Sequence, residues 1–225
     1  MHQFVLKIVA FGCLLVVGVT PCLATPSPSV WVTVTPLGMN TRDFFFLRSE
    51  TRHPGSYYAY SETMSLVRCR TTTNELVESI LLRDAEYVSD ADADDEKWQC
   101  HEKSVIPFDL PKYLREQKVH LLQPAGSQQL RVIGNQLVDV SESKRRVLVS
   151  KAVLTHGLAH WDVLGSGLSD EDNKVRLSSA WSASAPGRLK LPEGRLVVVE
   201  SGKAEGESNF WQNVVFARAE GSVRE

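Results

Sequence analysis

The sequence predicts a mainly β protein, folded as an antiparallel sandwich or a partly closed barrel with one short helix near 109–117. Segments of alternating apolar and polar residues recur along the chain at intervals of about ten residues, as strands of such folds do. The turn-forming stretches "APG", "PEG" and "SGKAEGES" separate the later segments. Two cysteines outside a predicted leader are a third indication, because one disulfide would hold neighbouring strands together.

The first 24 residues have the composition of a secretory signal peptide. Lys7 precedes the apolar run Ile8–Val19, and small residues lead up to Ala24. The run is 12 residues long, whereas a membrane span needs about 20. We therefore expect cleavage after Ala24, a periplasmic or extracellular location and no transmembrane segment after cleavage. A retained anchor is the alternative.

Residues 25–225 are expected to form a single β-rich exported domain. The stretch 123–129, "QPAGSQQ", is the one candidate boundary for a division into two halves. Lys7 is the one charged residue of the leader, so residues 25–225 hold 24 of the 25 basic side chains and all 27 acidic ones. Without a basic excess to neutralise phosphates, the composition predicts no nucleic-acid partner.

Cysteine usage predicts a disulfide. Cys13 and Cys22 lie in the leader, so an even pair, Cys69 and Cys100, remains. In an exported chain such a pair indicates a structural bridge. Closing a loop of about thirty residues would destabilise the unfolded state by roughly 3–4 kcal/mol.

The N-terminal half reads as a run of strands. Val30, Val32 and Val34 alternate with polar neighbours and would share one strand face. The segment 73–83 is ambiguous between helix and strand, because the preceding residues can form a helix capping box. Its strand-like neighbours, one carrying Cys69 and the next Cys100, favour a strand and a meander.

The later segments also carry local signals. Asp109 can cap a short helix over 109–117, and Pro111 is tolerated in its first turn. Gly134 and Asn135 predict the turn of a hairpin. Further strands are expected in the segments 145–155, 174–184, 195–201 and 210–219.

His156 and His160 are the candidate metal ligands, with Asp162 as a third. On a helix the two histidines would share a face, as in the H-E-x-x-H zinc motif, but Gly157 replaces the glutamate that acts as general base. On a strand they would stand about 13 Å apart, too far to share one ion. We therefore expect no metal and no cofactor, with a metal-dependent hydrolase as the alternative.

Other chemical motifs are incomplete. The acidic stretch Asp90–Glu96 lacks the glycine and glutamate that an EF-hand calcium loop needs. Ser166 lies between glycines, but the spacing of a G-x-S-x-G elbow is not met. The sequence therefore does not favour an enzyme.

Tyr57, Tyr58 and Tyr60 form the one clustered set of aromatic residues that suits a binding surface. The predicted function is non-catalytic binding or assembly through protein–protein contacts, with another exported or envelope protein as partner. A carbohydrate- or lipid-binding β module using these rings is a further alternative.

Overall fold

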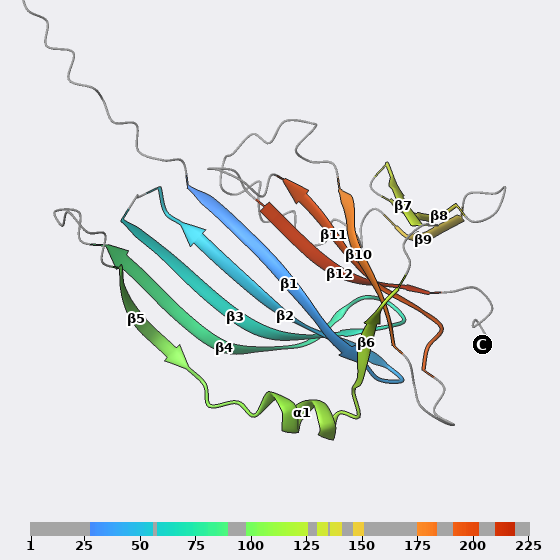
Figure 1. The fold of residues 1–225 in the computed structure, drawn as a ribbon, viewed down its shortest axis with the longest axis horizontal. Helices are drawn as coiled ribbons and strands as arrows, with labels where there is room; N and C mark the ends of the chain where they lie inside the picture. Colours follow the sequence, from blue (N-terminus) through green and yellow to red (C-terminus); the bar gives the residue numbers. More distant parts are fainter. Residues whose placement is uncertain are drawn as a thin grey trace, which may run out of the picture.

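The computed structural model describes residues 28–55, 58–89, 98–125, 130–134, 136–140, 146–150, 175–183, 191–202 and 210–218. These residues form a nine-stranded sheet, a three-stranded sheet and one short helix (Figure 1). The predicted mainly β class with one short helix is confirmed.

The N-terminal half is an antiparallel meander in which each strand pairs with the next along the chain. Its strands are long and lie side by side in Figure 1. They are β1 (Ser29–Met39), β2 (Asp43–His53), β3 (Ala59–Arg70), β4 (Leu76–Ser89) and β5 (Trp98–Val105).

The second half returns to β1. Helix α1 (Leu110–Glu116) leads into β6 (His120–Pro124). The small sheet follows, made of β7 (Leu130–Ile133), β8 (Gln136–Asp139) and β9 (Arg146–Val149). The last three strands of the large sheet are β10 (Arg176–Ala183), β11 (Gly194–Gly202) and β12 (Phe210–Arg218).

Strand β1 closes a five-stranded barrel. One of its edges pairs with β2, whereas the other is shared by β12, through Trp31 and Val32, and by β6, through Gly38 and Met39. The ring therefore runs β1–β6–β10–β11–β12, and β2 to β5 extend it as an open sheet. A Cβ at Gly38 would lie 2.5 Å from the carbonyl oxygen of His120, so only glycine lets β6 approach here.

Among the described residues, two apolar clusters form the core, one on each side of β11 and β12. Val197, Val199 and Trp211 pack with Leu137 and Val149 of the small sheet. On the opposite side, side chains from β11 and β12 pack against the start of β2 and the end of β3; this cluster includes Phe44, Phe46, Val67, Leu196 and Phe216. Because both faces are covered, β11 reads as the unbroken apolar run "LVVV" and not as an alternating strand.

Helix α1 forms as its local signals predict. Asp109 caps it by accepting a hydrogen bond from the Lys112 backbone N–H at 2.9 Å, and Pro111 occupies its first turn. Tyr113 anchors the helix to the open sheet, because its ring lies edge-on to Phe45 and its hydroxyl donates to Glu78 at 2.7 Å. The helix therefore packs over one end of β2–β4.

Two further local predictions are confirmed. The ambiguous segment 73–83 is a strand from Leu76 onward, paired with β3 on one side and, further along, with β5 on the other. Strands β7 and β8 form the hairpin predicted at Gly134, whose φ of 57° lies in the left-handed region that glycine adopts freely.

The leader 1–24 lies outside the described residues, as does most of the candidate boundary 123–129. Within the part of the chain that the structure describes, no helix has the length and hydropathy of a membrane span.

Candidate functional site

Four aromatic rings meet on one face of the open sheet, one from each of β2 to β5. The ring of Tyr60 lies 4.5 Å from that of Tyr87 and nearly parallel to it. It also lies 5.3 Å from the His53 ring and 5.2 Å from the Trp98 ring. We call these four rings the aromatic row, and the side of the sheet that carries them the aromatic face.

The register of the meander aligns these rings. Tyr60 is paired with Tyr87 across β3 and β4, and side chains directly opposite each other point to the same face. Two β-bulges, at Val77 and Leu82, each add one residue to β4. If β4 lacked these two extra residues, the same turn between β3 and β4 would bring Ala85, and not Tyr87, opposite Tyr60.

Charged groups flank the aromatic row. Glu62 lies among three partners, since it accepts hydrogen bonds from Ser49, Arg83 and the Tyr87 hydroxyl, each at 3.3 Å. A carboxylate with three donors is held in one position, so this part of the face is preorganised.

Arg83 links the row to β5. It donates to the Tyr87 hydroxyl at 2.7 Å and to the Cys100 sulfur at 3.6 Å, and it lies 3.5 Å from Glu102. The hydrogen bond with Tyr87 raises the pKa of the Arg83 guanidinium, so this group stays cationic. The face thus combines tyrosine, tryptophan and arginine, the residue types that contribute most to protein interfaces.

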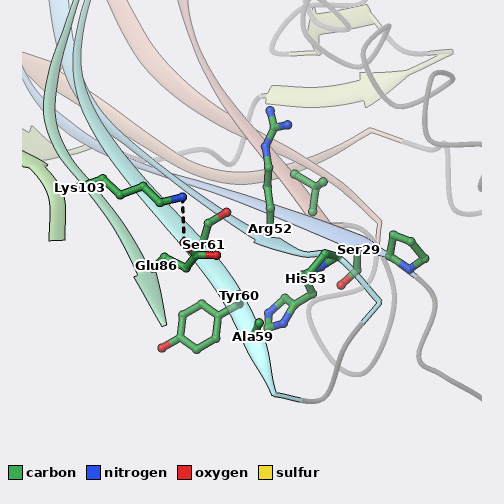
Figure 2. A pocket seen from close by; sticks show the side chains of 11 residues that line it. Ser29, Arg52, His53, Ala59, Tyr60, Ser61, Glu86 and Lys103 are labelled. Atoms are coloured by element: carbon green, nitrogen blue, oxygen red, sulfur yellow. Dashed lines mark ion pairs between the residues drawn. The ribbon is translucent and has the colours of Figure 1, made fainter. Parts of the chain in front are cut away.

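A pocket of about 300 Å³ lies at the ends of β1, β2 and β3, and Arg52, Ser61 and Glu86 line it from the face opposite the aromatic row (Figure 2). His53 and Tyr60 belong to both the pocket and the row. Its ionic groups are already paired: Lys103 lies 3.0 Å from Glu86, and Arg52 is paired with Glu50 outside the lining. Because the pocket opens mainly on the other face and its charges are paired, it does not extend the aromatic row.

The predicted tyrosine cluster is placed in part. Tyr60 lies at the centre of the aromatic row, and Tyr58, at 45% exposure, lies just before it in the chain. Tyr57 lies outside the described residues. Sequence reasoning missed His53, Tyr87, Trp98 and Arg83, because they become neighbours of Tyr60 only through strand pairing.

The predicted Cys69–Cys100 disulfide is absent: both residues are free cysteines, the first buried and the second exposed. Cys69 lies opposite Leu76, near the start of β4, whereas Cys100 lies opposite Tyr87, near its end. Eleven residues separate these two positions on β4, two of them bulged, so at about 3.3 Å per regular residue they are roughly 30 Å apart. A disulfide requires Cα atoms within about 7 Å, so the two cannot bridge within one chain.

The candidate metal ligands His156, His160 and Asp162 lie outside the described residues, as does the acidic stretch 90–97. Among the residues that the structure describes, no group of three or more histidine, cysteine or acidic side chains is arranged to hold a metal. The hydrolase alternative therefore stays a prediction.

A second charged cluster is structural. Asp43 is 1% exposed and pairs with Arg68 at 2.7 Å and Arg70 at 2.9 Å. The Arg68 guanidinium lies over the Phe45 ring, beneath helix α1. The acid is buried and paired twice, so this cluster connects the start of β2 to β3.

The fold and the site define a class: a closed five-stranded barrel extended by a four-stranded meander that displays an aromatic face. No family model, no curated protein and no solved structure matches the chain. The function must therefore be argued from the site.

Proposed function

We propose that this protein is an exported, non-catalytic binding protein that holds another exported or envelope protein against its aromatic face. The observation that carries this proposal is the aromatic row itself, beside a cationic Arg83 and with Trp98 left 42% exposed. Tryptophan, tyrosine and arginine are the usual anchors of protein interfaces, and here Trp98 is exposed whereas Tyr60, Tyr87 and Arg83 are half-buried.

The arrangement of the rings favours a protein over a carbohydrate. Sugars stack on the open face of an aromatic ring. Tyr60 already has three ring neighbours, and Tyr87 has Tyr60 on one side and the Arg83 guanidinium 5.7 Å from its centroid. Ring edges and the Tyr60 hydroxyl are what these two residues offer, since the Tyr87 hydroxyl is already bonded to Arg83 and Glu62, and they suit edge contacts with a protein.

Site-specific photo-cross-linking in the source cells tests this proposal. A photoreactive amino acid at Trp98 should link to one defined protein other than a second copy of this chain, whereas the same group at Val147, 51% exposed on the small sheet, should not. Tyr87→Ala should weaken the link from position 98. Equal cross-linking from both positions, or none from position 98, would contradict a partner on the aromatic face.

A further inference from the structure

Strand β5 is the terminal strand of the nine-stranded sheet, and among the described residues none pairs with its outer edge. All of its eight residues except Ser104 are exposed. An edge strand presents a row of backbone N–H and C=O groups that can pair with another strand. Natural proteins protect such edges with charged side chains or bulges.

The protection of β5 covers only its second half. Ala85 pairs with Glu102 and Asp84 pairs with Ser104, so Lys103 is an extra, bulged residue. The lysine and the bulge interrupt the edge from this point onward. The regular part is the five residues Trp98–Glu102, and its midpoint is Cys100.

We propose that two copies of this chain pair antiparallel through β5, about a two-fold axis that passes at Cys100. Such an axis sets each residue opposite the residue of the second copy that lies equally far from Cys100 on its other side. Cys100 then faces Cys100 of the second copy, Gln99 faces its His101, and Trp98 faces its Glu102. All five regular residues of each strand are paired, and the Lys103 bulge of each copy stays outside the pairing.

The charges favour this register over its neighbours. An axis at Glu102 would set two carboxylates directly opposite each other, which is destabilising. An axis at His101 would set two histidines opposite each other and force the bulged Lys103 into the pairing. With the axis at Cys100 no like charges are opposed, and the exposed Trp98 ring gains the Glu102 side chain of the second copy as a neighbour.

This pairing goes beyond the proposed function and does not rest on it. A two-fold axis perpendicular to a sheet keeps corresponding faces on the same side. The two aromatic faces would therefore lie side by side on one continuous sheet, free for a partner. Failure of the pairing would leave a monomer with its aromatic face intact.

Sedimentation of the full chain under reducing conditions is the first part of the test. The wild-type chain should be a dimer. Cys100→Lys, which opposes two ammonium groups, should raise the dimer dissociation constant by at least roughly tenfold. Val105→Lys is the matched control, since it places a lysine at an exposed position of the same strand beyond the bulge, and it should leave the dimer intact.

Cysteine cross-linking tests the register and does not depend on the folding of the lysine variants. Opposed residues of antiparallel strands have Cα atoms about 4.5–5.5 Å apart, within the range of a disulfide. With oxidised glutathione as oxidant, two Cys100 thiols lose two protons and two electrons, which reduce one glutathione disulfide to two thiols. Wild type should form a covalent dimer, and Cys100→Ser should not.

Moving the cysteine checks the position of the axis. In the Cys100→Ser background, Gln99→Cys and His101→Cys should cross-link far less than the wild-type chain. A monomeric wild type, a covalent dimer that survives Cys100→Ser, or equal cross-linking from all three positions would overturn the proposal. A monomer whose β5 edge instead binds an extended segment of another protein would overturn it as well.

Discussion

Asn74 shows how one side chain joins two distant parts of the fold. It lies in the turn between β3 and β4 with a φ of 61°, in the left-handed region. Its side-chain amide donates to the Phe216 carbonyl at 3.2 Å and accepts from the Phe216 backbone N–H at 2.6 Å. The side chain therefore acts as a strand partner for β12 and ties the open sheet to the barrel.

We expect Asn74→Ala to lower the free energy of unfolding by about 2 kcal/mol, because two hydrogen bonds are lost and alanine is strained at positive φ. Asn74→Gly should cost less, since glycine accepts this backbone conformation. Urea unfolding measures both. The exposed Thr72→Ala is the control and should change stability by less than about 0.5 kcal/mol. Equal stability of wild type and Asn74→Ala would contradict the role of this residue.

Cys69 predicts a stability change at alkaline pH. Burial, together with the charge of Asp43, raises the pKa of its thiol to about 12. Because the folded-state pKa is raised, the unfolded chain loses the proton first, and stability falls as the pH rises from about 9 towards 12. Between pH 8 and pH 10 wild type should lose about 1 kcal/mol more than Cys69→Ala. Parallel losses in both proteins would show that this thiol does not contribute.

At the scale of elements, helix α1 tests how far local signals determine structure. It has seven residues, too few to be stable alone, so its cap and its packing on Phe45 must both contribute. Asp109→Ala should lower the free energy of unfolding by about 1 kcal/mol and increase hydrogen exchange in the helix. Asp109→Asn keeps a capping oxygen and should retain most of the stability. If alanine and asparagine behave alike, the cap is not what holds this helix.

The elements that were predictable are those whose signals are local. Asp109 and Pro111 mark the helix start, and Gly134 marks a hairpin, because each acts within a few residues of itself. The disulfide was predicted wrongly because a count of cysteines contains no register. Cys69 and Cys100 lie on strands separated by β4, near opposite ends of it.

The candidate site was predictable only at Tyr60. Its neighbours come from three other strands, and bulges at Val77 and Leu82 decide which residue of β4 faces it. A bulge depends on how the whole sheet twists and packs, so nothing in the β3–β4 sequence alone specifies Tyr87 as the partner.

At the scale of the whole molecule, the proposed location depends on removal of the leader. Protein recovered from the export compartment should begin at Thr25 in intact-mass and N-terminal analysis, because Ala24 ends a signal-like segment. A substitution that places arginine in the apolar run, such as Leu15→Arg, should block processing. Full-length chain recovered from the cytosol of wild-type cells would refute export.

The central claim is that the aromatic face binds a partner protein, and the affinity of the partner captured at position 98 tests it most directly. Titration calorimetry should show that Trp98→Ala weakens binding by about 2 kcal/mol, roughly thirty-fold, while Val147→Ala leaves the affinity unchanged. Both side chains are exposed, at 42% and 51%, so both variants should fold. Unchanged affinity in Trp98→Ala, or an equal loss in both variants, would contradict the account.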